Sequence, residues 1–204
     1  PNPANFTIGG SGTTASDRAQ WLAANHASTV DPVAANALDA TNTIALLQRI
    51  NFTGYAAANG AVYPNSGFGQ ALRSSAALIK ADVGIEAIHA FNGGWDTHVN
   101  QGPVITLDGG AMHTRMLDLA NALSAFHADV IQGTTAYGVT VVIISEFGRN
   151  ARENGNRGTD HGRGNVAFAT HRMQLDKGCK FCAPSRRLPR LNLSKSSFCC
   201  TAAT

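Results

Sequence analysis

Residues 139–144 read VTVVII, an unbroken run in which every side chain is β-branched. Such a run favours a strand. The lack of alternation with polar residues is typical of a central parallel strand that is covered on both faces. A shorter apolar run, GIEAIHAF at residues 84–91, ends at the turn residues 92–94. It predicts a second buried strand earlier in the chain.

The segment between these two runs predicts a long helix. From Asp108 to about Gln132, apolar side chains recur at alternating steps of four and three, which describes one stripe of a helix. The residues of this stripe are Met112, Met116, Leu119, Leu123, Phe126 and Val130. A strand, a long helix and a strand form a right-handed βαβ unit by default. We therefore expect an α/β fold with a mainly parallel sheet.

The first 80 residues predict helices joined by loops rich in glycine and asparagine. Asp31-Pro32 is a good helix start, and the Ala-rich stretch that follows extends to Arg49. A later group recurs at helical spacing: Phe68, Leu72, Ala76 and Ile79. No linker is visible before residue 171. We expect one domain over residues 1–170 and a separate tail over residues 171–204.

The tail differs from the rest of the chain in charge and in cysteine content. Residues 1–170 hold 9 Lys+Arg and 12 Asp+Glu, a net charge of −3, whereas residues 171–204 hold 7 and 1, a net charge of +6. All four cysteines lie in the tail: Cys179, Cys182, Cys199 and Cys200. We expect a poorly structured basic tail, with half of a zinc ribbon as the alternative. The overall positive charge therefore does not indicate nucleic-acid binding, and no run of about 18 apolar residues predicts a membrane span.

Polar residues follow both predicted strands. GGWDTH at residues 93–98 supplies Asp96 and His98, and SEFGR at residues 145–149 supplies Ser145, Glu146 and Arg149. In an open parallel sheet, ligands bind beyond the carboxyl ends of the strands. We therefore expect the two groups to lie at the same edge of the sheet.

The glycine-rich segment 145–165 adds a carboxylate and an imidazole side by side. It reads SEFGRNARENGNRGTDHGRGN, and long loops without periodicity are often functional. A mixed carboxylate and imidazole set suits Zn²⁺ or another divalent ion. The candidate ligands are Asp96, His98, Asp160 and His161.

Arginines in the same loop suit the anionic group of a phosphate or sulfate ester. Three of them are candidate substrate contacts: Arg149, Arg157 and Arg163. Each has an alternative reading as part of a solvated loop face, and Asp and His after a strand are also common turn residues.

The motifs GGWDTH, SEFGR and GTDHG, in this order and spacing, resemble the DUF1501 family, as does YPNSGFGQAL at residues 63–72. That family is largely uncharacterised and belongs to the alkaline phosphatase and sulfatase superfamily. The resemblance implies a partial three-layer α/β/α sandwich and a hydrolase site that uses one or two divalent ions, Zn²⁺, Mg²⁺, Ca²⁺ or Mn²⁺. It implies that Asp96, His98, Asp160 and His161 bind the metal, and an alternative alignment makes Glu146 a ligand.

The chain departs from the family pattern at both ends. Relatives usually carry an earlier Gly-Gly-x-Asp-Gly type motif, which this chain lacks, and residues 171–204 do not continue the family pattern. We expect a fragment that starts partway into the domain and ends in an aberrant tail. The resemblance also implies an exported, periplasmic protein whose signal is not in this chain.

Three functions remain open. The first is a metal-dependent hydrolase that acts on a small anionic ester, with Arg149 on the anionic group and Ser145 as a weakly favoured nucleophile. The second is a serine esterase or lipase that uses Ser145, although no G-x-S-x-G elbow occurs in the chain. The third is a binding or structural protein without catalysis, which the missing first motif favours. The sequence does not specify the oligomeric state.

Overall fold

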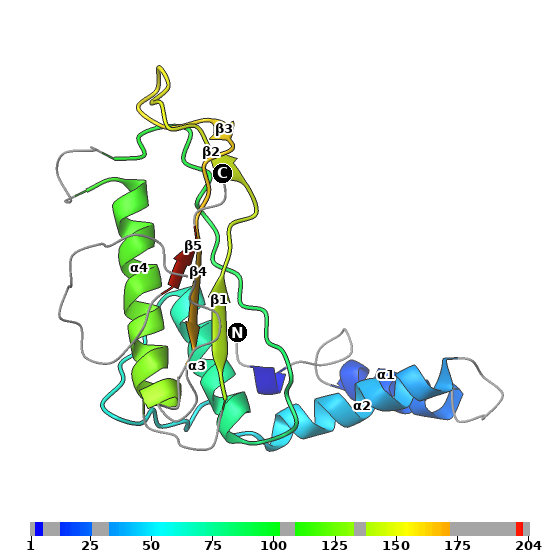
Figure 1. Cartoon of the computed structure of the whole chain (residues 1–204). Helices are drawn as coiled ribbons and strands as arrows, with labels where there is room; N and C mark the ends of the chain where they lie inside the picture. Colours follow the sequence, from blue (N-terminus) through cyan, green and yellow to red (C-terminus); the bar gives the residue numbers. More distant parts are fainter. Residues whose placement is uncertain are drawn as a thin grey trace. The chain divides into compact units, whose positions relative to one another are not determined.

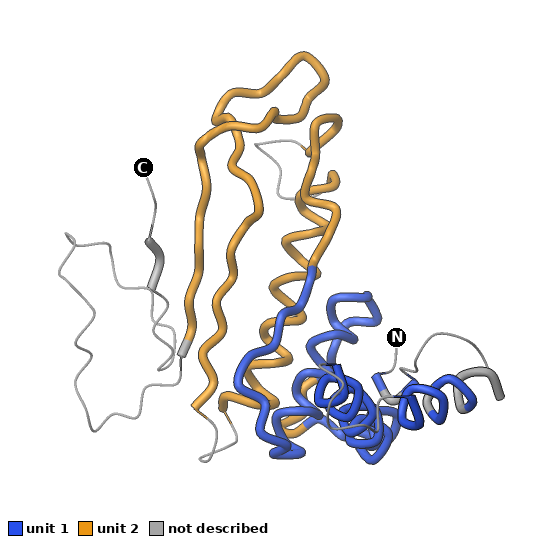
Figure 2. Tube along the Cα trace, turned by 90° about the vertical axis from the view of Figure 1, so that its right-hand side faces the viewer, with its two compact units in different colours: residues 1–57, 62–91 blue, residues 58–61, 92–204 orange. Residues whose placement is uncertain are grey.

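The computed structural model describes residues 3–5, 13–25, 33–102, 109–132, 138–171 and 199–201. The chain divides into two compact units, which Figure 2 shows in different colours. Unit 1 comprises residues 1–57 and 62–91, and unit 2 comprises residues 58–61 and 92–204. The architecture is mixed α/β, as the sequence predicts at this level. Most of the expected tail, residues 171–204, lies outside the described residues.

Unit 1 is helical. It contains the short 3-10 helix η1 (Pro3–Asn5) and the helices α1 (Thr13–Asn25), α2 (Ala34–Arg49) and α3 (Gly67–Lys80) (Figure 1). The Ser66 hydroxyl caps α3 by accepting a hydrogen bond of 3.0 Å from the Gly69 backbone N–H. The apolar stripe of α3 is partly buried through Leu72 and Ala76. The predicted helices are confirmed here, except that Asp31-Pro32 lies outside the described residues.

Unit 2 contains the long helix. Helix α4 (Ala111–Phe126) continues as the π-helix η2 (His127–Gln132), which confirms the predicted helix from residue 111 onward. Residue 108 lies outside the described part of the chain. The carboxyl-terminal half is the buried half, and its apolar core consists of Ala122, Ala125, Phe126, Val130 and Ile131.

A buried carboxylate ties this helix end to residues 58–61. Asp129 is fully buried, and its Oδ1 accepts a hydrogen bond of 2.7 Å from the Ala58 backbone N–H. Asn59 Nδ2 also donates to the Ala128 carbonyl at 2.8 Å. These contacts explain why a segment of the earlier chain belongs to unit 2.

The strands of unit 2 form two small antiparallel sheets. Strand β1 (Thr140–Ile143) pairs with β4 (Ala167–His171), with Thr140 opposite His171, and β4 also pairs with β5 (Cys199–Thr201). The second sheet consists of β2 (Gly148–Arg149) and β3 (His161–Gly162). Figure 1 shows this shorter pair beyond the end of β1 and β4.

The described residues do not show the predicted parallel sheet. Residues 139–144 do contain a strand, but β1 lies at the edge of its sheet and Val142 is exposed rather than covered. Residues 84–91 form no strand, and Phe91 in that run is 72% exposed. The physical reason is the loop after β1, which turns the chain back so that β4 pairs with β1 antiparallel and no crossover helix is needed. Neither sheet in the described ranges has a parallel pair, and these ranges show no three-layer sandwich.

Among the helices that the structure describes, none combines the length and apolar character that a membrane crossing requires.

Candidate functional site

The candidate site lies in unit 2, where the segment 92–102 meets the loop that carries β2 and β3. Backbone hydrogen bonds join the two segments: the Asn100 N–H donates to the Asn156 carbonyl at 3.0 Å, and the Gln101 N–H donates to the Arg157 carbonyl at 2.9 Å. In Figure 1 the first segment is green and the loop is yellow. These bonds bring together the two polar motifs that the sequence analysis placed after separate strands.

The short ladder of β2 and β3 sets the positions of two site residues. Arg149 lies directly opposite His161 in the register. Beyond this pair, the Arg149 N–H donates to the Gly164 carbonyl at 2.7 Å, and the Gly164 N–H donates to the Arg149 carbonyl at 2.9 Å. Paired residues in an antiparallel ladder project their side chains to the same face. The side chains of Arg149 and His161 therefore lie on the same face of this ladder.

Gly158 allows the loop to approach the segment 92–102 closely. It is buried, and a Cβ atom at this position would overlap the backbone of His98 and the carbonyl of Thr97. Arg157 precedes it with a φ of 58°, a conformation that non-glycine residues seldom adopt. The loop is therefore shaped to fit against residues 97 and 98.

Three nitrogen atoms converge on one carboxylate oxygen. Asp96 Oδ1 lies 2.7 Å from His161 Nε2, 2.9 Å from His98 Nε2 and 3.1 Å from Arg149 Nη1. One carboxylate oxygen has about two lone pairs, so it cannot accept hydrogen bonds from all three nitrogens in good geometry, and the tautomer of His98 decides whether its Nε2 donates. One ligand atom from each of Asp96, His98 and His161 lies within 4.8 Å of the other two. Asp96 and His161 are 55% and 54% exposed, so the group opens to solvent.

Asp160 contacts the His98 ring at Nδ1, the ring nitrogen that does not face Asp96. Asp160 Oδ1 lies 2.9 Å from His98 Nδ1. Asn154 Nδ2 donates to the same carboxylate oxygen at 2.9 Å and to the His98 backbone carbonyl at 3.0 Å. His98 is therefore held through both its ring and its backbone.

Arg149 supports the segment 95–97. Its Nη2 donates to Thr97 Oγ1 at 2.9 Å and to the Trp95 carbonyl at 3.3 Å, while its Nη1 reaches Asp96. The side chain is only 17% exposed. Its buried Nε has no hydrogen-bond partner among the residues that the structure describes. Phe147 lies beside the group, stacked on the His161 ring with centroids 4.6 Å apart.

The contacts also favour the ionised form of both carboxylates. The hydrogen bond from His161 lowers the pKa of Asp96 below its ordinary value of 3.8; desolvation opposes this shift, and the nearby His98, His161 and Arg149 charges add to it. The hydrogen bonds from His98 and then Asn154 lower the pKa of Asp160 in the same way. At neutral pH both groups are therefore carboxylates, the form that binds metal ions.

The structure brings together four of the residues singled out in the sequence, Asp96, His98, Asp160 and His161, and Arg149 with them. Among the described residues, the side chains of the other candidates make no contact with this group. The Ser145 hydroxyl donates to the Phe147 carbonyl at 2.6 Å, and Glu146 is exposed. Arg157 and Arg163 are also exposed, and Arg157 contributes to the loop through its backbone.

Sequence reasoning missed the residues that assemble the group. Thr97 binds Arg149, Asn154 binds His98 and Asp160, and the Thr159 hydroxyl donates to Gln101 Oε1 at 2.8 Å. A signal for Asn154 was present, because Asn154-Gly155-Asn156 is typical of a turn in which an Asn side chain bonds backbone N–H groups. Asn154 Oδ1 does accept from the backbone of Asn156 and Gly158, at 2.9 Å and 3.1 Å.

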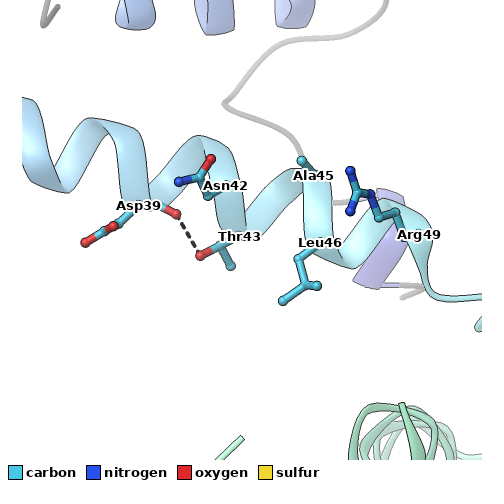
Figure 3. A pocket seen from close by; sticks show the side chains of 6 residues that line it. All are labelled: Asp39, Asn42, Thr43, Ala45, Leu46 and Arg49. Carbon is cyan, nitrogen blue, oxygen red and sulfur yellow. Dashed lines mark hydrogen bonds between the residues drawn. The ribbon is translucent and has the colours of Figure 1, made fainter. Parts of the chain in front are cut away.

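A hollow along helix α2 in unit 1 offers no comparable chemistry (Figure 3). All the residues that line it come from that single helix, and Thr43 within it already donates to the Asp39 carbonyl at 2.8 Å. The lining consists of Asp39, Asn42, Thr43, Ala45, Leu46 and Arg49.

Comparison with known protein families identifies a match over most of the chain. A family model described as "Protein of unknown function (DUF1501)" matches residues 13–170. No curated protein matches the chain, and no solved structure matches it.

Proposed function

Since the chain belongs to the DUF1501 family, whose description states no function, we propose from its site that it is a metal-dependent hydrolase of small phosphate or sulfate esters. The observation that carries this proposal is the convergence of Asp96, His98 and His161, whose ligand atoms lie within 4.8 Å of one another. We propose hydrolysis as the reaction because a divalent ion that is open to solvent can activate a water molecule and polarise an ester.

The donor set fits a first-row divalent ion. Bonds of about 2.0–2.2 Å in a tetrahedral site separate neighbouring ligand atoms by about 3.3 Å. The Asp96 Oδ1 to His98 Nε2 and His161 Nε2 distances of 2.9 and 2.7 Å are somewhat shorter than this spacing, so the three side chains would separate slightly on binding the ion. Two imidazoles and one carboxylate favour Zn²⁺ over Mg²⁺ and Ca²⁺, which prefer oxygen ligands.

The exposure of the group also fits a catalytic rather than a structural site. Structural zinc sites have four protein ligands, whereas catalytic sites have three and leave a position for water or substrate. Asp96, His98 and His161 supply three, and all three side chains are at least 40% exposed. When bound, the metal ion polarises the ester and lowers the pKa of a bound water.

The remaining residues divide into support and substrate contact. Arg149 donates to Asp96, Thr97 and the Trp95 carbonyl, so its geometry favours holding the ligand segment over binding the substrate. Exposed Arg157 and Arg163 are the candidates for the anionic group of the ester. Arg163 lies two residues after His161 in the sequence.

The test is metal binding followed by hydrolysis. The purified chain should bind about one equivalent of Zn²⁺ or Mn²⁺ by calorimetry, and Asp96→Ala and His161→Ala should each abolish most of this binding. His89→Ala is the matched control, because His89 is an exposed histidine of unit 1. Hydrolysis of an aryl phosphate or an aryl sulfate should follow and should stop on addition of a chelator.

Other outcomes select the alternatives. Metal binding without hydrolysis of either ester would favour a binding protein, and no metal binding at all would remove the proposal. Labelling of Ser145 by a fluorophosphonate probe would instead favour a serine esterase. Its hydroxyl bonds the Phe147 backbone, so nothing in the contacts of Ser145 favours that alternative. The export and the three-layer sandwich that the family resemblance implies remain predictions.

A further inference from the structure

We infer that Asp160 and Asn154 form a positioning pair that holds the His98 ring with Nε2 directed to the metal ion, and that Asp160 is not itself a ligand of that ion. The inference rests on the proposed function for the presence of a metal ion. The part that concerns the orientation of the His98 ring can be tested without the ion. It also departs from the expectation that Asp160 binds the metal.

The first observation is which ring nitrogen each carboxylate contacts. Asp160 Oδ1 lies 2.9 Å from His98 Nδ1, whereas Asp96 Oδ1 lies 2.9 Å from His98 Nε2. The two ring nitrogens point away from each other, so an oxygen bonded to Nδ1 is directed away from an ion bound at Nε2. Metal-binding histidines commonly donate their second ring N–H to a carboxylate, which fixes the tautomer and the ring orientation.

The second observation is the position of Asn154. Its Nδ2 donates both to Asp160 Oδ1 and to the His98 carbonyl, at 2.9 and 3.0 Å. Its Oδ1 accepts from the backbone N–H groups of Asn156 and Gly158. One amide therefore links the turn 154–158, the Asp160 carboxylate and the backbone of His98.

The third observation is the exposure of the Asp160 side chain. Asp160 is 58% exposed, so its carboxylate does not need a partner to be tolerated at the surface. Hydrogen bonds to an exposed carboxylate add little to stability, so a role in orienting His98 explains the arrangement better than a role in folding.

Zn²⁺ affinity tests the pair through graded substitutions. Asp160→Ala should weaken binding about 10- to 100-fold, and Asn154→Ala should weaken it by a similar factor. Asp160→Asn should retain most of the affinity, because its amide oxygen still accepts from Nδ1. Asn156→Ala is the control and should bind as the wild type does, since exposed Asn156 makes its hydrogen bonds here through its backbone.

A second measurement examines the ring without any metal. Long-range ¹⁵N–¹H correlation spectra report which nitrogen of a neutral histidine ring carries the proton. The metal-free wild type should carry it on Nδ1 of His98. In Asp160→Ala the preference of the His98 proton for Nδ1 should disappear, while the ring-nitrogen signals of His161 should stay as in the wild type.

Three results would overturn the inference. Asp160→Asn could lose as much affinity as Asp96→Ala, which would make Asp160 a ligand. Asp160→Ala could leave both affinity and tautomer unchanged. The wild-type ring could carry its proton on Nε2. If the wild type binds no metal while the proton lies on Nδ1 and leaves it in Asp160→Ala, the proposed function fails and the positioning of His98 stands.

Discussion

The end of helix α4 and the loops around Asp96 belong to the same unit, yet their side chains have different surroundings. At the helix end, Phe126 is 5% exposed and Val130 is completely buried. Around Asp96 the carboxylate and imidazole side chains are about half exposed, and they contact one another at 2.7–2.9 Å. The helix end is therefore stabilised by apolar burial, and the loops are stabilised by hydrogen bonds and ion pairs.

This difference separates stability from function within one unit. Apolar burial does not depend on the charge of any side chain, and it supplies most of the free energy of folding. Exposed ion pairs contribute little to that free energy. Changes at the helix end should therefore unfold the unit, whereas changes at the loops should alter the site and leave the unit folded.

The largest expected effect is at Phe126. Phe126→Ala removes a buried aromatic side chain and should lower the free energy of unfolding by about 3–5 kcal/mol, measured by urea denaturation. Met116→Ala, at a half-exposed position on the same helix, should change it by about 0.5 kcal/mol. Similar small values for both variants would show that the helix end is not the stabilising core.

A smaller effect is expected at Asp129, the polar member of the buried end. Asp129→Ala removes the acceptor of the Ala58 N–H and should destabilise the protein by about 1–3 kcal/mol, measured by thermal denaturation. Asp129→Asn retains an oxygen at this position and should cost less. Equal losses for the two variants would mean that the negative charge, and not the hydrogen bond, is what matters there.

At the loops, Gly158→Ala should act on the site more than on stability. The added methyl group would overlap the His98 backbone and push the turn away, so Zn²⁺ affinity should fall about 10- to 100-fold. Gly155→Ala, where the new Cβ meets open space, should bind as the wild type does. If the two variants bind equally well, the close approach of this turn is not needed for the site.

The smallest effect is the response of the loops to acid. The pKa values of Asp96 and Asp160 are lower in the folded chain than the ordinary 3.8, so their contacts favour the folded loop fully above pH 3.8. This contribution is lost as the pH falls through the lower folded pKa values. Amide exchange of residues 154–159 should therefore rise below about pH 3.8, relative to the intrinsic rate. Exchange at the helix end should rise only where the whole unit unfolds, and a parallel rise in both regions would remove the distinction.

Local patterns were enough to predict the helices. The stripes of α3 and α4 repeat every three or four residues, and a single helix can satisfy such a pattern from its own neighbours in the sequence. The strand within residues 139–144 was predicted for the same reason. The run at residues 84–91 was misread because an apolar run becomes a strand only if another backbone pairs with it, and the sequence does not specify that partner.

The sequence predicted which residues form the candidate site, but not the structural reason why they lie together. The proximity of Asp96 and His161 was expected from the carboxyl ends of parallel strands. In the structure it results from the antiparallel pair β2 and β3 and from the hydrogen bonds of Asn154. The bond from Asn154 to His98 and the contact of His161 with Asp96 join residues 56 and 65 positions apart, so only the two motifs themselves could be recognised in advance.

Strands β2 and β3 are two residues long, and this limits where the chain tolerates insertions and deletions. Adding or removing one residue within either strand reverses the side to which its later side chains point, so Arg149 and His161 would no longer share a face. Length changes at Gly155, where the chain meets open space, leave that alignment intact. Among natural or engineered variants of this loop, we expect length differences to be excluded within the two strands.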